Sequence, residues 1–305
     1  MSDRIRTYLA KRASLDRHTL ECPKPPASLR TVIVIPAIGE ESTLPETRES
    51  LTHCNPDLLS QTLIMVVVNN RSPEVIDSEI FEENRRTLTW LRSSPYPEIH
   101  LAMIDASSPG FELSKKEGVG SARKIGMDHA ANLLLRSSSE APLIVCLDAD
   151  TLVQPNYLDA LYAFAVSENP WAAVINYAHT IPEDPTEQAA IVSYELFLRY
   201  QELGLRHADS PYAFHTIGST IACTPEAYAA VSGMNRRKAG EDFYFLQQLK
   251  KTGSVTRIKN TTVHPSPRNS WRVPFGTGKR IGRFLDNTRD EYLVYHPDIY
   301  AILKD

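Results

Sequence analysis

The most constraining feature of the sequence is an unbroken apolar run, residues 143–147, that leads directly into Asp148 and Asp150. Such a run without polar alternation is typical of a strand buried on both faces in a parallel sheet. Because side chains alternate along a strand, the two carboxylates are expected to share one face at its carboxyl end. Two hard oxygen ligands suit Mg²⁺ or Mn²⁺ held together with a phosphorylated ligand. On this segment alone, a helix-capping or turn role for Asp150 is the alternative.

The composition predicts a globular protein with a full core. The chain has 305 residues, 42% of them hydrophobic, which suits one large α/β domain. The net charge of −4 gives no general reason to expect nucleic acid as a partner. The four cysteines, at positions 22, 54, 146 and 223, are too far apart to indicate a disulfide framework or a zinc site. With no signal-like stretch and no apolar run of membrane-spanning length, a cytoplasmic protein is expected.

Residues 1–30 read as a basic N-terminal appendage. They carry seven Lys or Arg against three acids and end in a proline-rich stretch. Ile5, Tyr8 and Leu9 have helical spacing, which predicts a short helix packed on the main domain. Peripheral contact with an anionic membrane surface is the less favoured alternative.

The segments from residue 31 onward predict alternating strands and helices. Residues 31–36, 63–68 and 100–104 read as parallel strands, and 42–60 has room for a crossover helix. A helix is expected to begin at Gly118-x-Gly120. This spacing lacks the third glycine of a dinucleotide fingerprint, and no phosphate-binding P-loop is present, so a Rossmann oxidoreductase is disfavoured.

The second half of the chain contains another acidic pair, Glu241-Asp242, at the predicted start of a helix. Acids in a first helical turn commonly stabilise the helix dipole, which is the alternative to a catalytic role. The other elements predicted here are helices over 157–166 and 187–205, strands over 171–177 and 213–223, and a helix from Pro225.

Several motifs, taken in chain order, resemble the family-two glycosyltransferases of the GT-A fold over about residues 31–265. They are Val34-Ile35-Pro36-Ala37 with Glu40, Asn69-Asn70-Arg71-Ser72, Gly120-Ser121-Ala122-Arg123-Lys124-Ile125-Gly126, Asp148-Ala149-Asp150, Gly218-Ser219, Gly233 and Gly240-Glu241-Asp242-Phe243. The resemblance implies a single Rossmann-like, mostly parallel sheet flanked by helices, with an acceptor-side subregion. It also implies a UDP- or GDP-sugar donor and an acceptor that the motifs do not identify.

The resemblance assigns a role to each matching residue. Nucleoside contacts fall on Pro36, Glu40, Asn69 and Asn70, a nucleotide contact on Arg123, ribose and metal contacts on Asp148 and Asp150, and the base on Asp242 with Glu241 beside it. Family members often have Asp where this chain has Asn69-Asn70. The nucleoside contact is therefore expected to use amide geometry here.

The expected reaction is sugar transfer to an acceptor hydroxyl. A divalent metal stabilises the charge that grows on the diphosphate leaving group, and Asp242 takes the proton from the attacking hydroxyl. Direct displacement inverts the anomeric centre. The alternatives are an inactive GT-A nucleotide-binding module, against which both acidic pairs argue, and a nucleotidyltransferase, against which the acidic loop 36–41 argues.

The C-terminal region, residues 266–305, is predicted to form a basic flexible lid and a tail of helix and irregular structure. His264, just before it, is a candidate third metal ligand. Lys279 and Arg280 are expected to bind the donor diphosphate, with Trp271 or Phe275 against the sugar or acceptor. The alternative is a solvated loop or a patch for an anionic partner. The lid is supported by five basic residues that fall between Pro265 and Leu285 with no acid among them: Arg268, Arg272, Lys279, Arg280 and Arg283.

Overall fold

The computed structural model describes residues 3–71, 77–93, 98–137, 139–268 and 276–305. The chain divides into two compact units, and each is described by itself. Unit 1 comprises residues 1–176 and 217–263, and unit 2 comprises 177–216 and 264–305. The predicted boundaries after residues 30 and 265 stay predictions.

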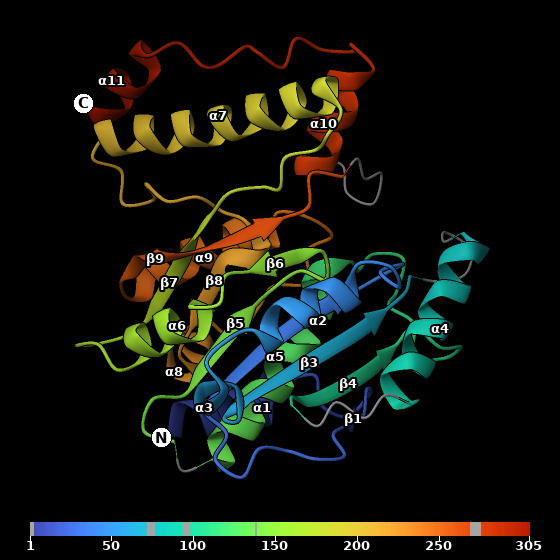
Figure 1. Cartoon of the computed structure of the whole chain (residues 1–305). Helices are drawn as coiled ribbons and strands as arrows, with labels where there is room; N and C mark the ends of the chain where they lie inside the picture. Colours follow the sequence, from blue (N-terminus) through green and yellow to red (C-terminus); the bar gives the residue numbers. More distant parts are fainter. Residues whose placement is uncertain (1–2, 72–76, 94–97, 138, 269–275) are drawn as a thin grey trace. The chain divides into compact units, whose positions relative to one another are not determined.

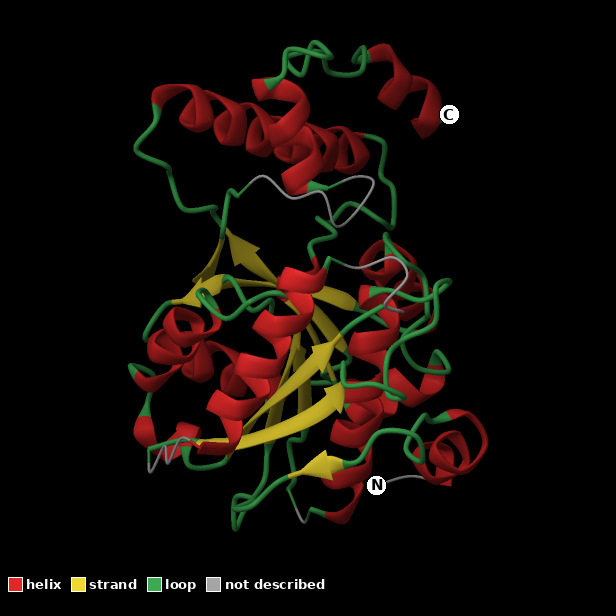
Figure 2. Ribbon diagram, turned by 90° about the vertical axis from the view of Figure 1, so that its right-hand side faces the viewer, coloured by secondary structure: helices red, strands yellow, loops and turns green. Residues whose placement is uncertain are grey.

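Nine strands form one sheet in the order β1-β4-β3-β2-β5-β8-β7-β9-β6 (Figures 1 and 2). β2 pairs in parallel with β3 and β5, and β3 pairs in parallel with β4, whereas β1, β8 and β7 join by antiparallel pairing. The predicted α/β fold with a mostly parallel sheet flanked by helices is confirmed. The strands are β1 (Leu20–Glu21), β2 (Thr31–Ala37), β3 (Thr62–Asn69), β4 (His100–Ala106), β5 (Leu143–Cys146), β6 (Thr151–Val153), β7 (Ala172–Tyr177), β8 (Ile221–Cys223) and β9 (Val255–Pro265).

The helices of unit 1 cover the sheet. They are α1 (Asp3–Arg12), α2 (Leu44–Thr52), α3 (Pro56–Leu59), α4 (Ser78–Ser93), α5 (Val119–Arg136), α6 (Tyr157–Ala165), α8 (Pro225–Ala230) and α9 (Glu241–Thr252). β2 and β3 are buried along their whole length, as their continuous apolar runs predict. α5 packs tightly on these strands, because a Cβ added at Gly126 would lie 2.4 Å from a methyl of Val34 and 2.9 Å from one of Val67.

The N-terminal segment is part of unit 1. α1 buries Ile5 and Tyr8 and packs against α5 and α8, so the predicted N-terminal helix and its packing are confirmed. Its anchor is Asp128 of α5, which is fully buried and accepts hydrogen bonds from the hydroxyls of Tyr8 and Tyr228 at 2.5 and 2.7 Å. Lys124 supplies the compensating charge 3.0 Å from the same carboxylate.

Unit 2 contains the three remaining helices of the described chain, α7 (Pro185–His207), α10 (Thr277–Leu285) and α11 (Asp298–Lys304). α7 and α10 share an apolar core of Ala190, Ile191 and Ile281. Among the described residues, no helix is both long enough and apolar enough to span a bilayer.

One predicted strand is much shorter in the structure. Residues 213–223 were expected to be extended, but only Ile221–Cys223 form a strand, and Gly218–Thr220 form a 3₁₀ turn. Gly218, at the start of this turn, lies against the guanidinium of Arg123.

Candidate functional site

Arg123 joins the two acidic motifs of the sequence. It lies in the first turns of α5 and is only 3% exposed. Its Nη2 donates to Asp148 Oδ1 at 2.7 Å, and its Nε donates to Glu241 Oε1 at 3.0 Å. Burial opposes the positive charge, but the two carboxylates outweigh it, and the pKa of Arg123 is raised. Residues 118 positions apart in sequence, Arg123 and Glu241, are therefore held together as one charged cluster.

Two parts of the surrounding backbone make room for this cluster. A Cβ added at Gly218 would lie 2.0 Å from Arg123 Nη2, so only glycine fits there without displacing the guanidinium. At the start of α5, a Cβ at Gly120 would lie 2.5 Å from the carbonyl oxygen of Arg237, and the Gly120 N–H donates to that oxygen at 3.2 Å. The Gly118-x-Gly120 spacing thus packs α5 against the segment that leads into α9.

Glu241 and Asp242 have different surroundings. Glu241 is buried and bound to Arg123, whereas Asp242 is half-buried and its Oδ1 accepts from the N–H of Phe243 at 2.7 Å. Removal from water, together with the negative charge of Glu241, raises the pKa of Asp242 to about 7. A carboxyl group with a pKa near neutrality is suited to accept and release protons.

The predicted metal-binding acids lie in a turn rather than on a strand. β5 ends at Cys146, and the N–H of Thr151 bonds back to the carbonyl of Asp148 at 3.2 Å. Strand alternation therefore does not apply to these two residues, and the expectation that their carboxylates share one face stays a prediction. The turn is anchored from α2, because the Thr47 hydroxyl donates to the Ala149 carbonyl at 2.9 Å.

The acids of this turn fit a divalent metal only in part. Arg123 binds Oδ1 of Asp148, whose side chain is 32% exposed. Among the described residues, no group of three or more His, Cys, Asp or Glu side chains is placed to hold a metal ion. Asp148 and Asp150 offer the oxygen ligands that Mg²⁺ or Mn²⁺ prefers, but further ligands would have to come from a bound phosphate. The metal therefore stays a prediction.

His264, the third candidate ligand, belongs to unit 2. Its Nδ1 lies 2.9 Å from the carbonyl oxygen of Ala178, so Nδ1 carries the proton and Nε2 is left as the acceptor. This tautomer suits metal ligation through Nε2. Its membership of the metal site stays a prediction.

The carboxyl ends of β2 and β3 are tied together by Asn84 of α4, a residue that the sequence analysis missed. The Asn84 side chain accepts from the N–H of Gly39 at 2.9 Å and donates to the carbonyl of Asn69 at 3.1 Å. Glu40, next to Gly39, is buried, and its Oε2 accepts from the hydroxyl of Thr43 at 2.6 Å. Pro36 lies inside β2, which continues to Ala37, so it does not end the strand as predicted.

Asn70 is a predicted nucleoside contact whose buried side-chain atoms are unpaired in the described part of the chain. It is fully buried, and neither its side-chain oxygen nor its nitrogen has a hydrogen-bond partner in the described part of the chain. Its backbone is held by bonds to Ala106 and Leu113. A buried amide without partners costs free energy, and a ligand that pairs with it would recover that cost.

The predicted diphosphate ligands of unit 2 lie on a helix. Residues 277–285 form α10, where a flexible loop was expected. Arg280 and Arg283 share one buried acid beyond residue 285, Glu291, whose two oxygens lie 2.5 and 2.6 Å from their Nε atoms, so the three side chains keep a single net positive charge. Lys279 is exposed. Trp271, Arg272 and Phe275 lie outside the described residues.

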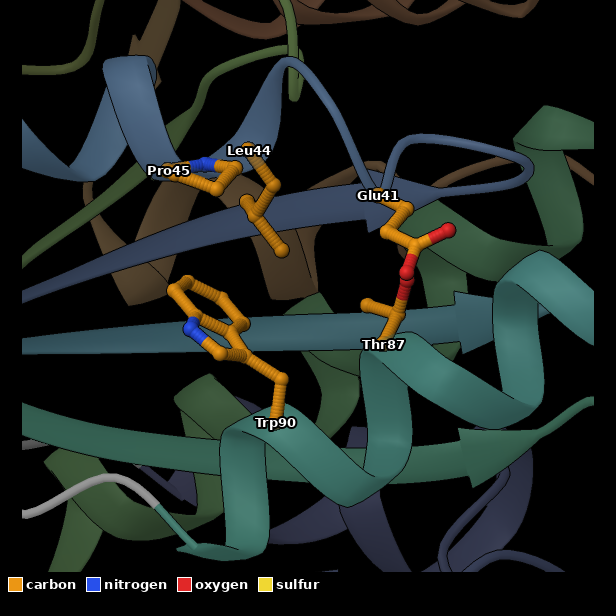
Figure 3. A pocket seen from close by; sticks show the side chains of 5 residues that line it. All are labelled: Glu41, Leu44, Pro45, Thr87 and Trp90. Carbon is orange, nitrogen blue, oxygen red and sulfur yellow. The ribbon is translucent and has the colours of Figure 1, made fainter.

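A small pocket opens between α2 and α4 (Figure 3). Its volume is about 100 Å³, and its lining residues are Glu41, Leu44, Pro45, Thr87 and Trp90. Glu41 is already bound to Arg86 at 2.8 Å. Since drug-sized ligands occupy roughly 300 Å³ or more, this pocket is too small for a nucleotide sugar, and none of the predicted site residues lines it.

The comparisons with known proteins bear on the fold. No protein-family model and no curated protein matches the chain. A structure of S. aureus TarS 1–349 in complex with UDP-GlcNAc matches with a TM-score of 0.51 and 12% sequence identity, covering 80% of this chain and 60% of that chain. The two proteins share a fold. A second structure of S. aureus TarS matches with a TM-score of 0.49 and 13% identity over 78% of this chain and 37% of that one. The chain thus spans about 60% of the TarS 1–349 structure.

Proposed function

We propose that this protein is a family-two-type glycosyltransferase that moves a sugar from a nucleotide-sugar donor to an acceptor hydroxyl. The observation that carries the proposal is that Arg123 makes two ion pairs, one with Asp148 and one with Glu241. These ion pairs join the turn that contains Asp148 to the start of the helix that contains Glu241 and Asp242. A donor-side acid and a candidate base are thereby held in one cluster of unit 1. The fold shared with a TarS structure in complex with UDP-GlcNAc supports a nucleotide sugar as the donor.

In the proposed reaction Asp242 is the general base. It accepts the proton of the acceptor hydroxyl while that oxygen bonds to the anomeric carbon of the sugar. The bond from this carbon to the diphosphate breaks, and its electron pair leaves on the diphosphate. Attack opposite the leaving group inverts the anomeric centre. Glu241, bound to Arg123, keeps a negative charge beside Asp242 and helps to hold its pKa near neutrality.

Asp148 and Asp150 of unit 1 would hold Mn²⁺ or Mg²⁺ together with the donor diphosphate. When bound, the metal neutralises charge that develops on the diphosphate. Arg123 contributes a fixed positive charge in the same place, because it is bound to Asp148.

The proposed donor nucleotide is uridine diphosphate. The Asn70 amide offers one donor group and one acceptor group, which complement the N3–H and O4 of uracil. The UDP-GlcNAc of the TarS complex agrees with this choice.

The experiment that tests the proposed function is incubation with Mn²⁺ and a panel of nucleotide sugars, with release of free nucleotide as the readout. We expect release of UDP from one UDP-sugar, with faster release in the presence of an acceptor. Pyrophosphate formation from a nucleoside triphosphate and a sugar phosphate would instead identify a nucleotidyltransferase. Donor binding without any turnover would identify an inactive binding module.

Asp150→Asn is expected to abolish the Mn²⁺-dependent part of UDP binding. Loss of one carboxylate from a site with few protein ligands removes both charge and coordination. Calorimetric titrations with UDP, with and without Mn²⁺, measure the effect, and Asp57→Asn on the surface of α3 is the control. Asp148→Asn is a less clean test, since it also removes the partner of Arg123. Unchanged metal-dependent binding in Asp150→Asn would contradict the assignment.

Asn70→Leu is expected to weaken UDP binding about tenfold without lowering the stability of the free protein. Both amide atoms lack partners in the described chain, so an apolar side chain of similar size gives up no internal hydrogen bond, whereas the two lost bonds to uracil, at about 0.7 kcal/mol each, cost about 1.4 kcal/mol in binding. Thermal unfolding and calorimetry measure the two effects. A matched control is Asn84→Leu, which breaks two bonds and should destabilise the protein. Normal UDP affinity in Asn70→Leu would remove Asn70 from the donor site.

A further inference from the structure

Large apolar side chains are exposed mainly on unit 2. Of the sixteen that are exposed in the described chain, eleven belong to this smaller unit. The five of unit 1 are Phe111, the neighbouring pair Tyr162 and Val166, and the neighbouring pair Phe243 and Tyr244. Ten of the eleven lie on α7, on residues 292–295 and on α11, and we call this set the outer face: Val192, Leu196, Leu203, Tyr292, Leu293, Val294, Tyr295, Ile299, Ile302 and Leu303.

α7 contributes a single stripe to the outer face. At 100° per residue, Val192, Leu196 and Leu203 fall within about 40° of one another around the helix. Leu196 and Leu203 are 63% and 64% exposed. Another side of the same helix buries Ala190 and Ile191 against α10, so the exposed stripe is additional to the core face of α7.

The other two parts of the outer face are fixed to α7. The hydroxyl of Tyr200 donates to the carbonyl of Tyr295 at 2.6 Å, and the ring of Tyr300 on α11 packs edge-on against Tyr200. Tyr300 lies so close to Gly204 that an added Cβ would be 2.3 Å from its ring. Figures 1 and 2 show the segment before α11 running alongside α7. The outer face is therefore one preorganised surface rather than a loose tail.

The size of the outer face exceeds what a monomer normally exposes. Each of these side chains presents about half of its surface to solvent, which amounts to roughly 1,000 Å² in all. The largest apolar patch of a typical monomer is about 300–600 Å², and a stable interface buries about 800 Å² per partner.

The charges around the outer face favour a second copy over a lipid surface. Within residues 286–305 the exposed acids are Asp286, Asp290, Asp298 and Asp305, and the exposed bases are Arg289 and Lys304. This excess of acid opposes binding to an anionic bilayer. On α7, Arg199 and Arg206 are each paired with a glutamate four residues earlier, Glu195 and Glu202, at 2.5 and 2.7 Å, so these two bases do not offset the excess of acid.

We propose that the outer face of unit 2 is a twofold interface with a second copy of this chain. Each copy contributes the same surface, so that α7 and the 292–303 segment of one protomer cover those of its partner. This inference concerns unit 2 alone and does not depend on the proposed glycosyltransferase reaction.

The test is the oligomeric state of the full chain. Sedimentation equilibrium at about 1–100 µM is expected to give a dimer for the wild type. The double variant Leu196→Glu and Leu203→Glu places two charges on each copy, and thus four in the interface. It should raise the dimer dissociation constant at least about 100-fold. The control is Val166→Glu with Phe111→Glu, two residues of unit 1 that are 52% and 45% exposed, which should leave the dimer unchanged. Ile302→Glu with Leu303→Glu on α11 is a second interface variant, and circular dichroism confirms that each variant is folded.

Three results would overturn the proposal. The first is a wild type that is still monomeric at about 100 µM. The second is a dimer that persists in both interface variants although each variant is folded. The third is a wild-type monomer that floats with phosphatidylcholine–phosphatidylserine vesicles, together with loss of this flotation in the interface variants. The last result would identify the outer face as a lipid-binding surface.

Discussion

Replacing Asp242 by asparagine is expected to lower sugar transfer by two to four orders of magnitude, about the contribution of a positioned general base, while UDP binding stays normal. Asparagine preserves the shape of the side chain and can still accept the hydrogen bond from the Phe243 N–H. It cannot take a proton from an acceptor hydroxyl. Initial rates measured with saturating donor, together with calorimetry for UDP, separate the two effects.

The pH dependence gives a second measure of the same residue. Because Asp242 must be ionised to act as a base and its pKa is raised to about 7, the wild-type rate should rise with pH through about 7 and then level off. Glu241→Gln removes the negative neighbour that helps to raise this pKa, so the rise should move to lower pH. A pH profile unchanged by Glu241→Gln, or near-normal turnover in Asp242→Asn, would show that Asp242 is not the base.

The free energy of unfolding provides the control for Asp242→Asn. The folded protein binds the Asp242 proton more tightly than the unfolded chain, in which the pKa returns to about 3.8. Ionisation of this group therefore costs stability as the pH rises from about 4 to 7. Asp242→Asn cannot ionise, and at pH 8 it should be at least as stable as the wild type. A large loss of stability would mean that lost activity reports unfolding rather than chemistry.

The central strands β2 and β3 were predictable because each one is a dense apolar run. The predicted strand at 31–36 is observed at Thr31–Ala37, and that at 63–68 is observed at Thr62–Asn69. α4 was missed, since its many charged residues hide a regular pattern. Its buried residues Ile80, Leu88 and Leu91 follow helical spacing, and this signal was present in the sequence.

The candidate site was predictable as a set of residues but not as a set of contacts. The order of the motifs singles out Asp148, Glu241 and Arg123, yet nothing local indicates that the arginine would bridge the two acids. That contact depends on three chain segments meeting in space. The same limit explains Glu291, which lies outside the basic segment and nevertheless pairs with both Arg280 and Arg283.

Replacing Arg123 by methionine is expected to destabilise the protein by about 3–5 kcal/mol, because it leaves the buried carboxylate of Glu241 without its counter-charge. Both side chains of this ion pair are at most 5% exposed. The Asp148 partner is 32% exposed, so water screens its charge and its share of the loss should be much smaller. Urea unfolding measures the free energies, and Arg85→Met, which removes an exposed ion pair with Glu82, should cost no more than about 0.5 kcal/mol.

A double-mutant cycle assigns the loss to its partner. Glu241→Leu combined with Arg123→Met removes both charges, so the pair should be far less destabilised than the sum of the two single variants. The cycle with Asp148→Asn should show a smaller coupling, since that carboxylate can be hydrated when Arg123 is absent. If Arg123 instead served mainly to bind the donor, Arg123→Met would fold with near-normal stability and lose UDP affinity. That outcome would contradict the bridging role, because an arginine that holds two acids together must stabilise the fold before any donor arrives.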